Sequence, residues 1–265
     1  MNEILQKIIL GIIQGLTEFL PVSSSGHLEI AKVLIGDDYL SSDSLLTTII
    51  LHFGTALATI VVFWHDIRQL LGDLFIRRSS TSIRFVLAIG VSMIPAVIIG
   101  ILLEDQINAM FTGQLLLVGI SLFVTGGLLL LADRAVTADK DVSVFHGFLI
   151  GLAQMVAILP GISRSGSTIS TSVLLRVDRE KAARFSFLMV VPLIFGKIAL
   201  DIFTLEIVPH EASWISLSAG FLAAFFVGIW ACRWMIGLVK RSKLYYFTIY
   251  CVIAGIFAIS LHYFL

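Results

Sequence analysis

ILQKIILGIIQGLTEFLPVSSSGHLEIAKVLI, residues 4–35, is an apolar stretch interrupted by Pro21 and three serines. Neither side of the interruption reaches the roughly 20 apolar residues that a helix needs to cross a bilayer. The stretch therefore predicts two short helices that enter a membrane and leave it on the same side, as a re-entrant hairpin does. Val144–Leu175, which contains LPGISRSGST at 159–168, predicts a second hairpin of the same kind.

The composition around these stretches indicates a membrane protein. Of 265 residues, 58% are hydrophobic and 14% are charged, whereas soluble domains are about 45–50% apolar and about 25% charged. Lysine plus arginine and aspartate plus glutamate number 18 each, so no net charge favours a nucleic-acid partner. The composition argues against a soluble enzyme, a disordered chain or a nucleic-acid binder, and predicts an all-α polytopic protein embedded in a lipid bilayer.

Six further stretches are long and apolar enough to be transmembrane helices. They are Leu45–Trp64, Ile83–Leu103, Leu115–Ala132, Phe185–Phe203, Trp214–Met235 and Leu244–Phe264. Basic residues collect in the loop Asp66–Ser82, after the second hairpin and before the last span, whereas the remaining loops are acidic. Because positive residues favour the cytoplasmic side, six crossings and two hairpins place every basic loop inside and both termini outside.

The chain also repeats itself within this single membrane domain, 1–265. Five residues of the first hairpin recur 140 positions later: Gly11, Gln14, Ser23, Ser25 and Gly26 as Gly151, Gln154, Ser163, Ser165 and Gly166. Each half, about 1–135 and 136–265, contains one hairpin and three spans. Since three crossings are an odd number, the second half is inverted, and the breaks of an inverted-topology repeat are expected to meet near the bilayer midplane.

Three ionisable residues at membrane depth lie in the two breaks. Such residues cost about 2.5–3.5 kcal/mol to insert, so they favour a functional role. Glu18 and His27 belong to the first break and Arg164 to the second. Helix starts bind anions through free N–H groups, and a guanidinium suits phosphate, so we expect a site for a phosphate or diphosphate. His52 stays open between a packed core histidine and a site residue.

Gln14-xxx-Glu18 followed by FLPVSSSGH (19–27), together with LPGISRSGST (159–168), closely resembles the bacterial undecaprenyl pyrophosphate phosphatase family, known for bacitracin resistance. The similarity extends along nearly the whole chain. It implies a multi-pass enzyme of the bacterial cytoplasmic (inner) membrane, with its active site open to the outer face. Its reaction removes one phosphate from undecaprenyl diphosphate, a polyprenyl diphosphate lipid, and gives the monophosphate carrier for peptidoglycan and other cell-wall polymers. A divalent cation, Mg²⁺ or Ca²⁺, assists.

The resemblance places the catalytic residues at Glu18, Ser24, His27 and Arg164. It places substrate-binding residues at Gln14, Ser23, Ser25, Gly26, Ser163, Ser165, Gly166 and Thr168. Glu18 is also the expected metal ligand. The family allows Glu or Gln at the first motif position, and Gln14 leaves this motif with one carboxylate, which argues against a metal held by two.

Three routes of attack stay open at this stage. Ser24 ranks first, with His27 or Glu18 as the base that takes its proton. His27 could instead attack directly, or Glu18 could activate a water molecule.

Inverted repeats also build transporters, so a transporter or flippase for a lipid phosphate or another anion is the rival interpretation. The sequence leaves a homodimer open.

Overall fold

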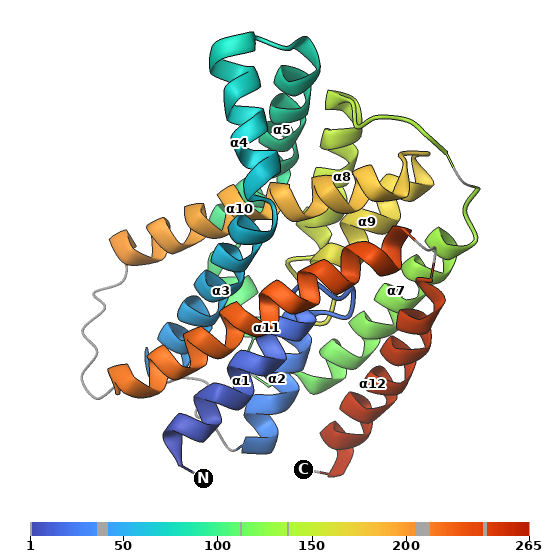
Figure 1. Ribbon diagram of the computed structural model, residues 1–265. Coiled ribbons are helices and arrows are strands. Elements are labelled where there is room, and N and C mark those ends of the chain that lie inside the picture. The colour runs from blue at the N-terminus through green and yellow to red at the C-terminus, as the bar shows by residue number, and fades with distance from the viewer. Residues whose placement is uncertain are drawn as a thin grey trace.

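The computed structural model describes residues 2–35, 42–111, 113–136, 138–204, 213–240 and 243–264, and no β-strand occurs among them (Figure 1). The first half contains α1 (Glu3–Thr17), α2 (Ser24–Ile35), α3 (Ser42–Val62), α4 (Trp64–Gly72), the π-helix η1 (Asp73–Arg77), α5 (Ser80–Leu102), α6 (Glu104–Met110) and α7 (Leu115–Asp133). The second half contains α8 (Val144–Val156), α9 (Arg164–Leu174), α10 (Arg179–Thr204), α11 (Trp214–Lys240) and α12 (Tyr245–Phe264). The all-helical prediction is confirmed.

Several of these helices are suited to crossing a membrane. Among the described residues, α5, α7, α11 and α12 are long and apolar enough, and α3 forms a fifth candidate with the helical segment that follows it at a 68° bend. Its composition and helix lengths therefore identify the chain as a multi-pass membrane protein. The predicted span Phe185–Phe203 lies in α10, whose C-terminal side chains fall largely outside the described part, as do the predicted acidic loops near residues 37 and 206.

The two interrupted stretches each form a helical hairpin. Helix α1 packs on α2 and α8 packs on α9, with breaks at residues 18–23 and 157–163. Left-handed backbone makes each reversal, at Ser23 with φ 71° and at Gly161 with φ 91°. The chain then starts a new helix, because the Ser23 and Ser163 hydroxyls accept the N–H groups of the third helical residues, at 3.2 and 3.0 Å.

Small residues bring the hairpins close to the long helices. A Cβ atom built on Gly11 of α1 would clash with the carbonyl oxygen of Gly220 on α11. A Cβ atom on Gly151 of α8 would lie 2.5 Å from the carbonyl oxygen of Ser92 on α5. Glycine permits this approach of two backbones, which is how helices associate in lipid. The positions of the two breaks are thereby fixed against α11 and α5.

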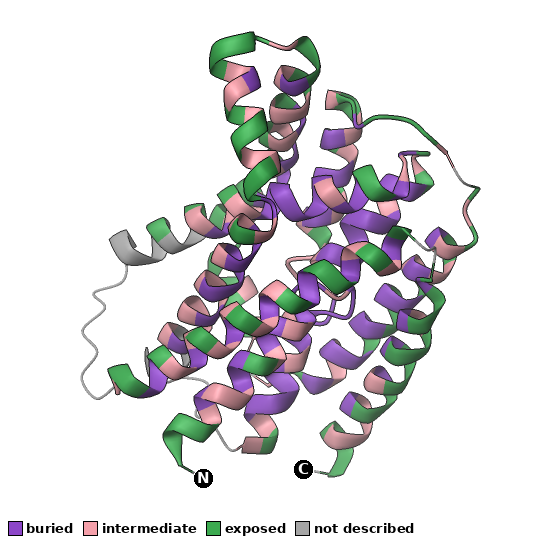
Figure 2. Cartoon of the chain, viewed as in Figure 1, coloured by how far each residue is buried: buried purple, intermediate pink, exposed green. Residues whose placement is uncertain are grey.

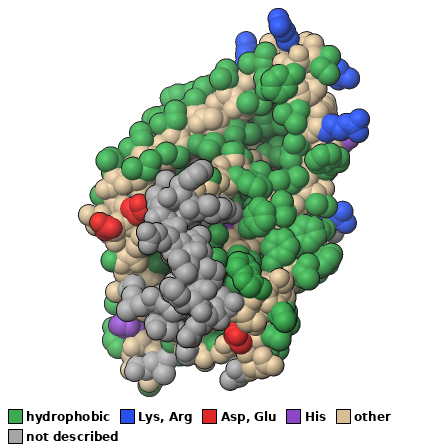
Figure 3. All heavy atoms as spheres, turned by 90° about the vertical axis from the view of Figure 1, so that its left-hand side faces the viewer, with side chains coloured by type: hydrophobic (Ala, Val, Ile, Leu, Met, Phe, Trp, Pro, Cys, Tyr) green, Lys and Arg blue, Asp and Glu red, His purple; other side chains and the backbone are tan. Residues whose placement is uncertain are grey.

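The surface divides by charge. Figure 3 shows Lys and Arg side chains toward one end of the visible face and Asp and Glu side chains toward the other, with hydrophobic side chains between them. Buried residues line the interior and exposed ones cover the outer helix faces (Figure 2). Many exposed side chains are large and apolar, such as Ile253 at 63% and Phe226 at 63%. An apolar belt of this kind is expected of a surface that meets lipid.

Two predicted boundaries are wrong. Most of the predicted loop Asp66–Ser82 is helical, because α4 and η1 continue the chain after the bend at Phe63. The predicted span Trp214–Met235 ends too early, because α11 runs on to Lys240 and still buries Val239. In both places the apolar pattern ends before the helix does, since backbone hydrogen bonding continues wherever the residues pack or favour a helix.

Candidate active site

The two breaks touch in the interior of the protein. The Ser165 hydroxyl donates a hydrogen bond to the Leu20 carbonyl oxygen at 3.2 Å. A Cβ atom on Gly26 would lie 3.0 Å from Gly161 Cα, and one on Gly166 would lie 3.3 Å from the Pro21 carbonyl oxygen. Helices α2 and α9 both begin at this contact, so the positive ends of their dipoles are close together.

Glu18 is the centre of the polar groups at this contact. Its side chain is 7% exposed and follows the last residue of α1. The Arg164 guanidinium donates to one carboxylate oxygen. The Ser24 hydroxyl and the Gln14 amide donate to the other, at 2.7 and 3.0 Å. A carboxylate buried in this way is stabilised by its cationic partner and by hydrogen bonds.

The Ser24 contact bears on the choice of base. Ser24 is half-buried in the first turn of α2, and its hydroxyl donates to Glu18 Oε2. A carboxylate in contact with a hydroxyl group is the arrangement in which the acid can take the proton as the oxygen attacks. His27, the other candidate base, has its hydrogen bonds elsewhere.

His27 lies three residues after Ser24, but its ring has other partners. Nδ1 lies 2.8 Å from the Ser23 carbonyl oxygen, and Nε2 lies 2.8 Å from the Tyr250 hydroxyl on α12. The His27 and Tyr250 rings are also stacked, with centroids 5.5 Å apart. The structure therefore brings Ser24 and Arg164 into contact with Glu18 and pairs the His27 ring with Ser23 and with Tyr250 of α12.

Arg164 reaches the site from the first residue of α9. Its Nη1 donates to the Ser186 carbonyl oxygen of α10 at 3.3 Å, and its side chain is 15% exposed. A guanidinium carries five N–H donors, so donors remain for an anion. Thr168 supports this position, since its hydroxyl donates to the Arg164 carbonyl oxygen at 2.8 Å and lies 2.6 Å from Ser186 Oγ.

The remaining predicted substrate-binding residues hold the breaks in shape. Ser163 caps α9 and its backbone N–H donates to the Thr125 hydroxyl of α7 at 3.0 Å. Ser23 Oγ lies 3.2 Å from Ser25 Oγ, and the equivalent pair in the second break, Ser163 and Ser165, is 3.3 Å apart. The side chains of Ser24 and Ser25 are half-buried, so they lie on the accessible side of the first break.

The structure adds residues that the sequence analysis missed or left open. His52 Nε2 lies 3.9 Å from Glu18 Oε2, and the Thr55 hydroxyl lies 3.4 Å from the Gln14 amide nitrogen. Thr48, His52, Thr55 and Thr59 recur at helical spacing in an apolar span, and this polar stripe could have identified α3 as part of the site. Nothing in the local sequence indicates Tyr250, because its partner is 223 residues away.

A divalent cation fits these residues only if a bound phosphate supplies further oxygen ligands. Among the residues that the structure describes, no three His, Cys, Asp or Glu side chains form a metal-binding group. Gln14 Oε1 is buried and has no hydrogen-bond partner, and it belongs to the side chain that contacts Glu18. Hard cations prefer such oxygens and keep several positions for water or phosphate. The donor set therefore suits a cation shared with a phosphate.

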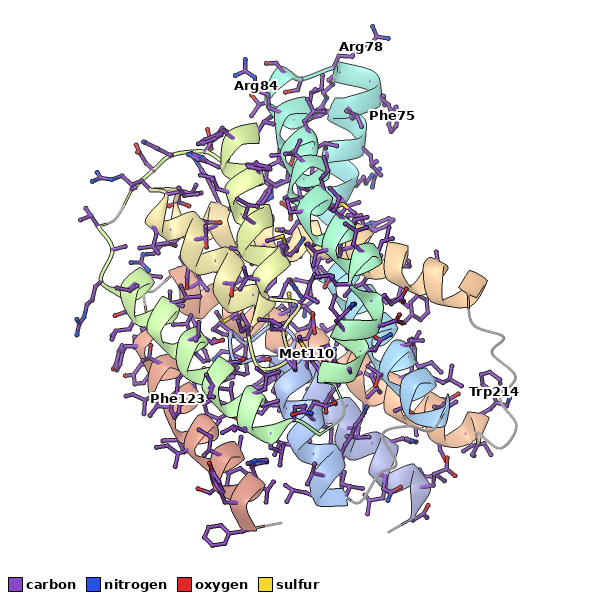
Figure 4. All side chains as sticks on the ribbon, turned by 180° about the vertical axis from the view of Figure 1, so that it is seen from behind. Phe75, Arg78, Arg84, Met110, Phe123 and Trp214 are labelled. Carbon is purple, nitrogen blue, oxygen red and sulfur yellow. The ribbon has the colours of Figure 1, made fainter. Side chains whose placement is uncertain are left out.

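The basic tip of the molecule is separate from this site. Figure 4 shows Arg78 and Arg84 pointing outward at the end of the α4 and α5 pair. Arg164 is instead enclosed and paired with Glu18. Of these three arginines, only Arg164 belongs to the site, and the buried Glu18 carboxylate balances its charge.

The fold and site define a multi-pass helical membrane protein in which carboxylate, hydroxyl and guanidinium groups meet where two helix breaks touch. The family model described as "Bacitracin resistance protein BacA" matches residues 7–257, and the chain belongs to that family.

Relatives match it along nearly their whole length. An undecaprenyl-diphosphatase of Christiangramia forsetii is 54% identical over 261 residues, covering 98% of this chain and 99% of the relative. An undecaprenyl-diphosphatase of Bacteroides fragilis is 44% identical, covering 97% of each chain. An undecaprenyl-diphosphatase of Methanobrevibacter smithii is 36% identical, covering 96% of each.

Proposed function

We propose that this protein is an undecaprenyl-diphosphatase, a membrane phosphatase that converts undecaprenyl diphosphate to the monophosphate carrier lipid and thereby confers bacitracin resistance. The observation that carries the proposal is the contact of Ser24 and Arg164 with the same buried carboxylate, Glu18. An anion carrier needs the arginine and the helix starts. It does not need a hydroxyl hydrogen-bonded to a carboxylate beside them.

Arg164 and the starts of α2 and α9 supply the positive charge for the diphosphate. Phosphoryl transfer depends mainly on positioning and on stabilising charge. In the absence of substrate, Glu18 balances the Arg164 charge at the site. A bound diphosphate shares the guanidinium donors with that carboxylate. The predicted residues Ser23, Ser25, Gly26, Ser163, Ser165 and Gly166 shape the two helix starts that receive its oxygens.

Ser24 is the proposed nucleophile and Glu18 its base. As the Ser24 Oγ–P bond forms on the terminal phosphorus, the bond from that phosphorus to the bridging oxygen breaks. The lipid monophosphate leaves with the electron pair, and the hydroxyl proton moves to Glu18. Water then attacks the phosphoserine phosphorus, Ser24 recovers its proton from Glu18, and inorganic phosphate leaves with one proton released. His27 lies one turn along α2 from Ser24, where Ser23 and Tyr250 hold its ring.

Gln14 Oε1 and the Glu18 carboxylate are the proposed protein ligands of a divalent cation, Mg²⁺ or Ca²⁺. Such a cation, when bound, neutralises charge on the phosphate oxygens. The orphaned Gln14 oxygen supports this assignment, since a buried acceptor without a partner is costly. Removal of the cation is therefore expected to reduce activity more than it reduces the stability of the fold.

The proposed topology has six spans and two re-entrant hairpins, arranged as inverted halves of about 1–135 and 136–265. The contacts between the breaks support it. Positions 21 and 26 become 161 and 166 when 140 is added, and the observed contacts are Gly26 with Gly161 and Gly166 with Pro21. The shift of 140 residues therefore relates each contact to the other, as expected when two equivalent units face each other. Helix pairs α1–α11 and α8–α5 exchange in the same way.

The proposed location is the bacterial cytoplasmic membrane, with the site open to the outer face. The basic end in Figure 3 supports this orientation, because arginine and lysine favour the cytoplasmic side. Cysteines introduced at Arg77 and Asn2 test it. A membrane-impermeant thiol reagent added to intact cells is expected to label position 2 and not position 77. Labelling of position 77 alone would reverse the orientation.

The deciding experiment is phosphate release from a polyprenyl diphosphate by the detergent-purified protein, with and without EDTA. Arg164→Ala and His27→Ala are compared with Arg84→Ala, which removes an arginine at the exposed tip. Metal-dependent release that the first two variants lose and the third retains supports the phosphatase and its site. No release by folded wild-type protein would favour the transporter interpretation. Uptake of a non-hydrolysable analogue into sealed vesicles then tests that alternative, and cross-linking tests the homodimer.

A further inference from the structure

The geometry points to Tyr250 as a positioning residue for His27, supplied to the first helix break by the last helix of the chain. This inference rests on the proposed phosphatase function for its kinetic test. The two residues lie on α2 and α12, and the pair is joined by both a hydrogen bond and ring stacking. Neither of His27's ring nitrogens contacts the Glu18 and Ser24 pair.

The hydrogen bonds fix the tautomer of a neutral His27 ring. The partner of Nδ1 is the Ser23 carbonyl oxygen, 2.8 Å away, and a carbonyl oxygen only accepts. Nδ1 therefore carries the hydrogen. In the neutral ring Nε2 then holds a lone pair, and the Tyr250 hydroxyl, 2.8 Å away, donates to it. The Ser23 carbonyl thus selects the tautomer, and Tyr250 stabilises it by donating to the Nε2 lone pair and by fixing the ring orientation.

The ring orientation is fixed from both sides. Ser23, whose carbonyl holds Nδ1, is itself held in left-handed backbone at the break. The Tyr250 ring lies against the imidazole at an interplanar angle of 15°. His27 is therefore held in one orientation before the substrate arrives, which is how a side chain at a binding site is preorganised.

Helix α12 is a rigid support for this contact. Thr248 donates from its hydroxyl to the Gly126 carbonyl oxygen of α7 at 3.2 Å. A Cβ atom on Gly255 would lie 2.9 Å from the Gly119 carbonyl oxygen, so the two backbones are in close contact there as well. Cys251 Sγ lies 3.8 Å from the Pro21 carbonyl oxygen of the first break. Tyr250 is thus held at a fixed distance from the break by residues on both sides of it.

The first test compares Tyr250→Phe with Tyr263→Phe, which removes a hydroxyl from an exposed position on the same helix. Tyr250→Phe keeps the ring stacking and loses one neutral hydrogen bond, so kcat is expected to fall about threefold to tenfold. KM should stay within about twofold, since a positioning defect acts on the reacting geometry. Tyr263→Phe should match the wild type. An unchanged kcat for Tyr250→Phe would overturn the inference.

A double-mutant cycle tests whether the effect passes through His27. Adding Tyr250→Phe to His27→Ala is expected to cause no further loss of activity, because the group that it positions is already absent. A full additional loss in the double variant would assign Tyr250 to another role and overturn the inference. Failure of the wild type to release phosphate would reject the proposed function instead, and that outcome leaves the next measurement intact.

The second test determines the tautomer of His27 by a measurement that does not depend on phosphatase activity. The protein has six histidines, and ¹⁵N-histidine NMR of the detergent-solubilised wild type and His27→Gln identifies the His27 resonances by their disappearance. The expected spectrum has a protonated Nδ1 and an Nε2 lone pair at neutral to alkaline pH. Tyr250→Phe should shift the Nε2 resonance and Tyr263→Phe should not. A protonated Nε2 in the neutral ring of the wild type would contradict the inference.

Discussion

The two breaks share one scaffold and carry opposite chemistry. The first has Glu18, Ser24 and His27, and adding 140 gives Ile158, Arg164 and Ser167 at the equivalent positions. The acid of the first break and the cation of the second become partners where the breaks touch. A single hairpin would leave one of these charges buried without its partner, which is costly. The comparison shows that the site forms only when both breaks are in contact.

The equivalent glutamines show the same division. Gln14 donates to the Glu18 carboxylate, whereas Gln154 donates to the backbone oxygen of Ser92 at 3.4 Å. Both side chains are buried, and both have an Oε1 atom without a hydrogen-bond partner. Gln14 therefore contacts an ionisable side chain, and Gln154 contacts a helix backbone. Substitutions at matched positions therefore separate the chemistry from the scaffold.

The largest effect is expected at the charge pair that joins the breaks. Arg164→Ala and Glu18→Gln should each lower kcat about a thousandfold or more, since each removes a group that stabilises or generates charge in the transition state. The double variant should lose much less than the product of the single losses, because the two residues act as a unit. Steady-state phosphate release measures this, with Arg84→Ala as control. Independent, multiplicative losses would contradict the joint site.

Ser24 and its neighbour give the next comparison. Ser24→Ala should lower kcat by at least about a hundredfold, since it removes the nucleophile. Ser25→Ala, one residue further on, should cost no more than about tenfold, because it removes one hydroxyl of the binding site and not the attacking oxygen. A phosphoenzyme trapped with labelled substrate is expected to survive acid and to be lost in alkali, as a phosphate ester of serine is. A label that survives alkali and is lost in acid would assign the attack to His27.

The paired glutamines test the proposed cation site. Gln14→Ala should raise the Mg²⁺ or Ca²⁺ concentration needed for half-maximal activity by about tenfold to a hundredfold, because it removes a metal ligand or the group that orients one. Gln154→Ala should change this concentration by less than about twofold. Titration of metal into EDTA-treated enzyme measures both variants. Equal shifts would indicate that Gln14 acts only on the fold.

The smallest effect concerns the scaffold that the two breaks share. Gly11→Ala is expected to lower the free energy of unfolding by about 1–3 kcal/mol, because the added methyl group meets the Gly220 backbone. Gly151→Ala should do the same against Ser92. Gly90→Ala, in α5, meets nothing within 4 Å and should be neutral. Thermal unfolding in detergent compares the three, and an unaffected Gly11→Ala would show that α1 and α11 are further apart.

Much of the architecture could be predicted because its causes are local. Pro21, the serines after it and the short apolar runs predict the first break, and the same pattern predicts the second. Hydropathy likewise predicts where long apolar helices occur. It does not predict where they end, because a helix such as α11 continues to Lys240 when its inner face still finds residues to pack against. The segment after Phe63 was missed for the same reason.

The sequence alone determined that this protein belongs in a membrane, contains two broken helices and carries Glu18, Ser24, His27 and Arg164 at the breaks. Only the tertiary structure decided which of them meet. Arg164 and Glu18 are 146 residues apart, and Tyr250 reaches His27 across 223. Such pairs depend on how closely whole helices approach one another, as at Gly11 and Gly220. Local hydropathy and helix propensity act over a few residues and contain no information about that approach.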